Sequence, residues 1–173
     1  MPDQEQIWHV DEHDNPIGPI GRDDSRGTGA RYRIVRVSVE DINGNVLLQK
    51  RVDTKKTYPG CWDTSAGGNI SYGESYDDAA ARELSEEVGI RDVDLQEVAY
   101  FYSEVVDPAD NKMNRFTKVY QTVVPMGITV TPQSDEVAEL VWVTPDELSD
   151  IIAEGRITDG LHQVAQRYYN IEH

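Results

Sequence analysis

The sequence has little of what marks a secreted or membrane-bound protein. It holds one cysteine, Cys61, which cannot form an intrachain disulfide, so we expect a reducing compartment. It has no run of 18 apolar residues, so we expect no membrane span. The first residues lack the basic and apolar regions of a secretory signal. Together these absences predict a cytoplasmic protein.

Basic residues are also scarce. The chain has 16 Lys and Arg against 32 Asp and Glu, a formal charge of −16 at pH 7. This excess of acid disfavours a nucleic-acid polymer or an anionic membrane as the main partner, because both attract basic surfaces. A small anionic ligand is compatible with the charge if metal ions lie between the ligand and the protein.

The hydrophobic pattern of this 173-residue chain predicts one domain of interleaved strands and helices. We expect strands at 31–39, 46–51, 62–66, 96–106, 116–124 and 137–143, and helices at 75–88, from Thr144 to about residue 154, and at 158–170. Asn43-Gly44 predicts a hairpin between the first two strands. We expect Gly67 and Gly68 to end the third strand. Residues 15–29 are rich in turn formers and predict an irregular connection.

An acidic cluster lies in the predicted helix at 75–88. Glu83, Glu86 and Glu87 are three and four residues apart, so they share one helix face and repel one another. Ser75 is placed to cap the start of this helix, and Gly89 its end. Carboxylate oxygens are the ligands that Mg²⁺ and Mn²⁺ prefer. The cluster is therefore either a solvated acidic face or a metal site.

Residues 68–90 resemble the Nudix box, G-x5-E-x7-R-E-U-x-E-E-x-G-U, in which U is aliphatic. Every fixed position is filled, by Gly68, Glu74, Arg82, Glu83, Leu84, Glu86, Glu87, Gly89 and Ile90. The resemblance covers roughly residues 30–155. It implies an α+β fold, the Nudix α/β/α sandwich with a mixed sheet between helices. It also implies a metal-dependent pyrophosphohydrolase that cleaves a nucleoside-diphosphate-linked or related organic diphosphate.

The resemblance also assigns roles within the box. The implied ligands of Mg²⁺ or Mn²⁺ are the carboxylates of three glutamates and one backbone carbonyl, from Glu83, Glu86, Glu87 and Gly67. Arg82 is expected to orient a box carboxylate through a bidentate pair. Glu74 is expected to pair with Arg82 at the start of the helix rather than to bind metal.

The general base is left open by the sequence. In this family it comes either from the box, which points to Glu83, or from a later loop, which points to Glu136 or Glu139. We take Glu83, Arg82 and Glu136 as the candidate catalytic residues. Glu104, in the predicted strand at 96–106, is a weaker candidate for an outer metal ligand.

A basic segment precedes the box. Residues 31–56 contain seven Lys and Arg against three acids, which is either a solvated surface or a wall that faces an anion. We expect Lys50 and Arg51 to contact substrate phosphates. Tyr58 and Tyr72 flank the site and are candidates for the lining of a substrate pocket.

The segment from Leu47 to Asp63 resembles a Nudix branch related to isopentenyl diphosphate isomerase. Those isomerases use a cysteine in the strand that runs into the box, after the tryptophan. Here that stretch, residues 62–67, has no cysteine, and Cys61 precedes Trp62. The intact hydrolase box therefore favours hydrolysis. An isomerase-like enzyme and a non-catalytic ligand-binding module are the alternatives.

The expected organisation is a single Nudix domain over residues 31–173, preceded by an extension over residues 1–30. The extension packs either on its own domain or on a partner, which leaves a homodimer open. The expected partner is a small-molecule diphosphate. The sequence alone does not identify that diphosphate.

Overall fold

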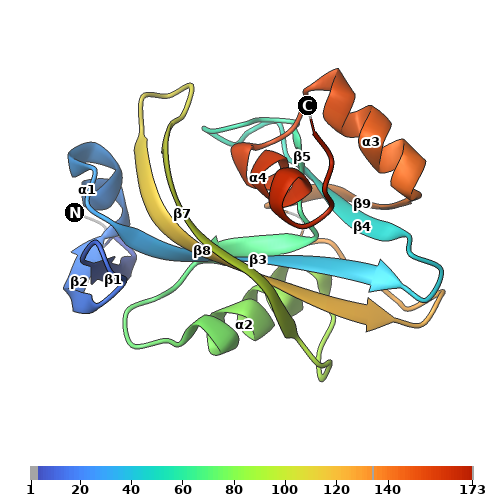
Figure 1. Ribbon diagram of the computed structural model, residues 1–173, viewed down its shortest axis with the longest axis horizontal. Helices are drawn as coiled ribbons and strands as arrows, with labels where there is room; N and C mark the ends of the chain where they lie inside the picture. The colour runs from blue at the N-terminus through green and yellow to red at the C-terminus, as the bar shows by residue number, and fades with distance from the viewer. Residues whose placement is uncertain (1–3, 134, 173) are drawn as a thin grey trace.

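The computed structural model describes residues 4–133 and 135–172. Its central mixed sheet has four strands, β3 (Tyr32–Asp41), β6 (Ala66–Asn69), β7 (Gln96–Val106) and β8 (Lys112–Val124). β3 pairs antiparallel with β6 and parallel with β8, which pairs antiparallel with β7. One helix lies on each face of this sheet, as Figure 1 shows. They are α2 (Tyr76–Val88) and α4 (Asp159–Arg167). The expected α+β sandwich, with a mixed sheet between helices, is confirmed.

A smaller antiparallel group of strands continues the sheet. It consists of β4 (Val46–Arg51), β5 (Trp62–Asp63) and β9 (Val137–Val143), and β4 pairs with both of the others. α3 (Pro145–Glu154) packs on this group together with α4. Thr144 and Glu147 form a capping box at its start, as the sequence predicts.

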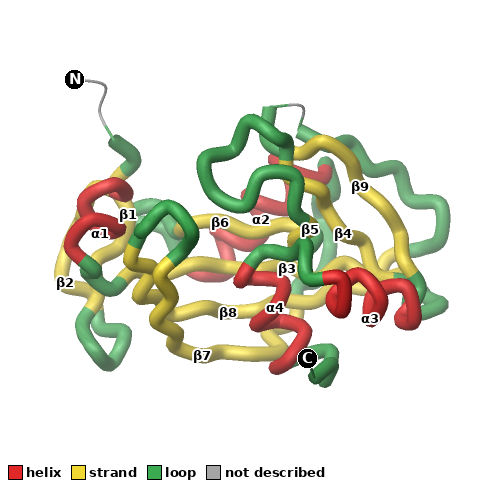
Figure 2. Tube along the Cα trace, turned by 90° about the horizontal axis from the view of Figure 1, so that it is seen from above, coloured by secondary structure: helices red, strands yellow, loops and turns green. Residues whose placement is uncertain are grey.

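The segment before residue 30 has regular structure, so the expectation of an irregular connection at 15–29 was wrong. It folds as β1 (Gln6–Val10), β2 (Pro16–Gly21) and α1 (Arg22–Thr28). β2 pairs only with β1 and is an edge strand, where prolines are tolerated. β1 also pairs with β3 of the same chain. Figure 2 shows these three elements together at one end of the sheet.

Three hairpin turns share one local design. In each, an aspartate carboxylate accepts hydrogen bonds from the backbone N–H groups two and four residues later and from an asparagine side chain four residues later. The aspartates are Asp11, Asp41 and Asp107. The fourth residue of each turn has a positive φ, and only the turn at 41–45 has glycine there. The Asn-Gly pair therefore marked only that hairpin, and the turn at 107–111 was predicted from its polar residues between two strands.

Gly67 and Gly68 do not end a strand, contrary to expectation, because both lie within β6 and pair with β3. Glycine is required at both positions because other atoms of the protein approach too closely to leave room for a Cβ. A Cβ on Gly67 would lie 2.8 Å from the carbonyl oxygen of Val35, and one on Gly68 would lie 2.3 Å from Oε1 of Glu83. The glycines therefore allow α2 and β3 to approach β6 closely.

Alternate residues of β3 face opposite sides of the sheet. Val35, Val37 and Val39 are fully buried in the cluster that includes the apolar face of α2. Tyr32, Ile34 and Arg36 point the other way and line a cavity. One face of β3 thereby packs against α2, and the other contributes to the cavity. None of the helices within residues 4–133 and 135–172 is long and apolar enough to cross a membrane.

Candidate active site

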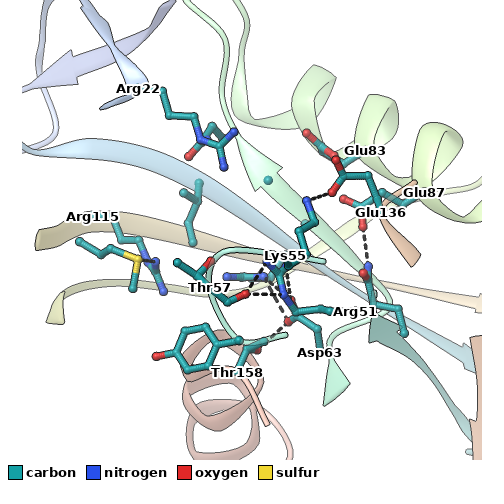
Figure 3. A pocket seen from close by; sticks show the side chains of 18 of the residues that line it. Arg22, Arg51, Lys55, Thr57, Asp63, Glu83, Glu87, Arg115, Glu136 and Thr158 are labelled. Atoms are coloured by element: carbon teal, nitrogen blue, oxygen red, sulfur yellow. Dashed lines mark hydrogen bonds and ion pairs between the residues drawn. The ribbon is translucent and has the colours of Figure 1, made fainter. Parts of the chain in front are cut away.

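A cavity of about 310 Å³ lies where α2, β6 and the end of β4 meet the loop before β9. Its lining residues come from both halves of the chain, and Figure 3 shows how they converge. Glu83 and Glu87 lie at one side, and Arg22 and Arg115 lie at the other. The cavity therefore has a carboxylate wall, formed by Glu83, Glu86 and Glu87, and an arginine wall, formed by Arg22, Arg26 and Arg115.

α2 presents the carboxylate wall because its two faces differ. Ala79, Ala80, Leu84 and Val88 are buried against the sheet. Ser75 caps the N-terminus by accepting a hydrogen bond from the backbone N–H of Asp78, and Gly89 ends the helix with a φ of 77°. Both caps are those that the sequence predicts. With the ends and the apolar face fixed, the glutamates are held beside β6.

Arg82 links the carboxylates of the box. Its Nε and Nη2 donate to the two carboxylate oxygens of Glu74 at 2.7 and 3.0 Å. Its Nη1 donates to Glu83 at 2.9 Å and to Glu86 at 3.3 Å. The bidentate pair with Glu74, together with Glu83, raises the pKa of Arg82 above its ordinary value. The pairing of Glu74 with Arg82 that the sequence predicts is present.

Glu83 and Glu87 lie deeper in the protein than Glu86. Burial raises the pKa of Glu83 above its ordinary value and, together with the charge of Glu83, raises the pKa of Glu87 further. Gln49 of β4 donates a hydrogen bond to Glu87. Glu86 keeps about half of its side-chain surface exposed (52%). A cation bound by these two carboxylates would favour their ionised forms.

The chemistry of these donors fits a hard divalent cation. They are carboxylate oxygens from one turn of helix, beside a strand whose Gly67 and Gly68 line the same cavity. Among the described residues, no three acidic, histidine or cysteine side chains are already arranged as a complete metal site. Instead Nη1 of Arg82 binds one carboxylate oxygen of Glu83 and one of Glu86.

Basic residues of β4 and of the loop after it form the floor of the cavity. Arg51 donates from Nε and Nη2 to the carbonyl oxygen of Thr57 at 3.2 and 3.0 Å, and its Nη1 lies 3.7 Å from Oδ2 of Asp63. Arg51 therefore fixes the loop at 52–61. Lys55 of that loop forms an ion pair with Glu136 (Figure 3). Burial and the nearby charges of Arg51 and Arg22 lower the pKa of Lys55.

Lys50 does not line the cavity, although the sequence placed it beside Arg51 in the site. Gln49 and Arg51 face the cavity, so the residue between them faces away. The ammonium of Lys50 lies 4.0 Å from a carboxylate oxygen of Glu139 and 5.7 Å from the ring centre of Trp62. The same contact places Glu139 outside the cavity.

Of the three remaining candidates, one lines the cavity and two do not. Tyr58 lines the cavity, and burial beside Asp159 raises its pKa to about 12. Tyr72 is half exposed and packs on Trp8 outside the cavity. Glu104 accepts a hydrogen bond from Tyr102 and also lies outside.

Several lining residues were missed by sequence reasoning. Arg22 and Arg26 come from α1, which was read as an irregular connection, and Arg115 was placed next to a turn but lies within β8. Arg36 of β3 donates to both carboxylate oxygens of Asp63 at 3.2 and 3.3 Å. These residues are far apart in the sequence, so no local motif marks them.

The comparison with protein families identifies one match. The NUDIX domain profile matches residues 30–165, which is most of the chain. Two curated relatives have similar sequences. The Nudix hydrolase PA4841 of Pseudomonas aeruginosa is 35% identical over 144 residues, which are 83% of this chain and 81% of the relative. Isopentenyl-diphosphate Delta-isomerase 2 of Photorhabdus laumondii is 34% identical over 143 residues, 83% and 79% of the two chains.

A solved structure also resembles the fold along nearly its whole length. The crystal structure of DR0079 from Deinococcus radiodurans superposes with a TM-score of 0.76 at 26% identity, covering 95% of this chain and 99% of that one. Its coverage exceeds that of the family profile and includes part of the segment before residue 30. The arrangement of the N-terminal elements is therefore compatible with a known fold.

Proposed function

The chain belongs to the Nudix family of hydrolases, and from this premise we propose that it is a metal-dependent pyrophosphohydrolase that cleaves a small organic diphosphate bound in the cavity. The observation that carries the proposal is the presence of a carboxylate wall and basic side chains in one cavity. A diphosphate needs both, because metal ions held by carboxylates and cationic side chains neutralise the same anion from two sides.

The residues that would hold the metal are Glu83, Glu86 and Glu87, with the backbone carbonyl of Gly67. When bound, Mg²⁺ or Mn²⁺ supplies neutralisation of the diphosphate charge and activation of the attacking water. Arg82 fixes the start of the helix through its bidentate pair with Glu74.

Glu136 is the base that the geometry favours. It lines the cavity from the loop before β9, and its carboxylate is outside the cluster on α2. Glu136 forms an ion pair with Lys55, and in this proposal its carboxylate accepts the proton of the attacking water. Glu83 remains the alternative base within the box. Lys55 and Arg51 supply positive charge toward the phosphates, and Arg51 does so while it holds the loop in place.

The proposal is tested with a panel of sugar nucleotides, dinucleotides, nucleotides and coenzyme A, with Mg²⁺ or Mn²⁺ and ³¹P NMR as the readout. We expect release of a monophosphate from at least one class and its loss in Glu87→Gln. Asp78→Asn is the matched control, because Asp78 is exposed on the same helix and the charge change is identical. The absence of turnover across the panel with either metal would contradict the proposal.

The relative named as an isomerase makes isomerisation of isopentenyl diphosphate the second candidate. Ala66 occupies the start of β6, in the stretch where such isomerases use a cysteine, and Cys61 does not line the cavity. We therefore expect no exchange between the two isomers of isopentenyl diphosphate. Measurable exchange by proton NMR would favour the isomerase over the hydrolase.

A further inference from the structure

The arginine wall contains a cation that forms no ion pair with any described residue. Among the described residues that line the cavity, Arg26 is the one basic side chain that has no ion pair and no hydrogen bond. Its Nε is buried without a partner. Burial and the nearby charge of Arg22 lower its pKa below the ordinary value for arginine, and the smaller effects of Tyr32 and Asp107 in the opposite direction do not offset them. A buried donor without a partner costs free energy of folding, so the position of this Nε is not explained by stability.

Arg115 shows a similar deficit on the neighbouring strand. Its side chain is almost completely buried, with 3% of the residue exposed. One Nη forms an ion pair with Asp159, and the other lies 3.3 Å from the sulfur of Met113. Its Nε, like that of Arg26, is buried and has no hydrogen-bond partner. The fork of an arginine is shaped to bind phosphate oxygens through two parallel hydrogen bonds.

These residues lie away from the proposed metal site. Figure 3 shows Arg22 and Arg115 on the side of the cavity opposite Glu83 and Glu87. Arg22 and Arg26 also precede residue 30, where the family match begins. The carboxylate wall and Arg115 thus lie within the segment that the family profile matches, and Arg22 and Arg26 lie in the N-terminal segment before it.

We propose that Arg26 and Arg115 bind a further phosphate group of the substrate, beyond the diphosphate that is hydrolysed. This inference rests on the proposed function and specifies its substrate class: an organic diphosphate that carries a third phosphate. That phosphate is either the end of a triphosphate chain or a separate phosphate on the organic part. Both present the same oxygens to the two arginines.

Matched substrate pairs test the proposal and distinguish the two sources. A nucleoside triphosphate is compared with its diphosphate, and coenzyme A with dephospho-coenzyme A, each with Mg²⁺. In one of the two pairs, we expect kcat/KM to be at least about tenfold higher for the member that carries the additional phosphate. This is the size of effect of a charge-assisted hydrogen bond. In Arg26→Gln the ratio of the two kcat/KM values is expected to fall to about one, while kcat/KM for the member without the additional phosphate stays the same.

Arg91→Gln is the matched control, because Arg91 is exposed and does not line the cavity. Equal rates within both pairs, or an unchanged ratio in Arg26→Gln, would overturn the inference while leaving hydrolysis of simple diphosphates intact. Thermal unfolding excludes a structural role: the melting temperature of Arg26→Gln is expected to equal or exceed that of the unchanged protein. A lower one would indicate that Arg26 stabilises the fold.

A binding measurement separates this inference from the proposed function. With EDTA present and no metal, millimolar inorganic phosphate is expected to raise the melting temperature of the unchanged protein and of Arg91→Gln, but not of Arg26→Gln. This result would support the arginine site even if no substrate in the panel were hydrolysed. Equal stabilisation of all three proteins, or stabilisation of none, would overturn it.

Discussion

The two walls of the cavity differ in how their charges are held. On the carboxylate wall, one arginine binds Glu74, Glu83 and Glu86 at once, and Gln49 donates to Glu87. On the arginine wall, Arg26 has no partner among the described residues. The first wall is organised before any ligand binds, and the second has unused binding capacity. The difference suggests that the first wall performs the chemistry and the second selects the substrate.

The largest expected effect comes from the residue that organises the carboxylate wall. Arg82→Lys keeps the charge but loses the bidentate pair with Glu74, because an ammonium has no planar fork. We expect kcat to fall about ten- to hundredfold, the range for groups that orient metal ligands. Steady-state kinetics on the best substrate of the panel check this, with Arg91→Lys as the control. Activity within twofold of the unchanged protein would show that the wall does not depend on Arg82.

Gly68→Ala disturbs the same wall from the strand side. The added Cβ would lie 2.3 Å from Oε1 of Glu83, so the carboxylate must move. We expect about a tenfold loss of apparent affinity for Mg²⁺, measured from the metal dependence of the rate. Gly27→Ala is the control, since nothing lies within 4 Å of the Cβ built there. If both variants behave alike, close packing at Gly68 is not needed for metal binding.

A smaller and different effect is expected on the basic side. Lys55→Gln removes a cation from the cavity, and the adjacent Lys56→Gln removes an exposed one that does not line it. We expect KM to rise about tenfold in the first variant and to change little in the second. A single ionic contact to phosphate contributes about a factor of ten to affinity. Loss of kcat without a change in KM would assign Lys55 to catalysis through Glu136 instead of to binding.

The smallest effect concerns stability without metal. The pKa of Glu87 in the folded protein lies above the ordinary value of 4.5, because the carboxylate is buried and lies near Glu83. The folded state therefore binds more protons than the unfolded one above pH 4.5, and stability falls as the pH rises through the folded-state pKa. Glu87→Gln has no carboxylate at this position, so its stability does not fall with pH in this way.

We accordingly expect metal-free Glu87→Gln to melt a few degrees above the unchanged protein at pH 8 and level with it near pH 4. About 1 kcal/mol corresponds to about 2–4 °C at this chain length. Calorimetry in EDTA measures the difference, and Mg²⁺ is expected to stabilise only the unchanged protein. A difference that does not vary with pH would show that Glu87 is not the titrating group.

The carboxylate wall was largely predictable from the sequence because its residues lie within one continuous segment. Helical spacing alone brings Glu83, Glu86 and Glu87 together, and Ser75 and Gly89 fix the ends of the helix. The glycines of β6 were misread, because their role depends on the approach of Glu83 and Val35, and these contacts exist only in the folded chain.

The arginine wall was not predictable for the same kind of reason. Arg26 and Arg115 meet only through the pairing of β1 with β3 and of β3 with β8, which the sequence pattern does not specify. Lys50 shows that a basic composition does not predict which side chains face the cavity. It belongs to the basic segment, but the alternation of side chains along β4 directs it to Glu139.

The central claim is that metal at the carboxylate wall and the cations of the cavity floor, Arg51 and Lys55, bind one diphosphate together. Isothermal titration with a methylene-bridged, non-hydrolysable diphosphate, with and without Mg²⁺, tests it most directly. We predict at least about tenfold tighter binding with Mg²⁺, a gain that is lost in Glu87→Gln and kept in Asp78→Asn. Equal affinity with and without Mg²⁺ in the unchanged protein would contradict the account.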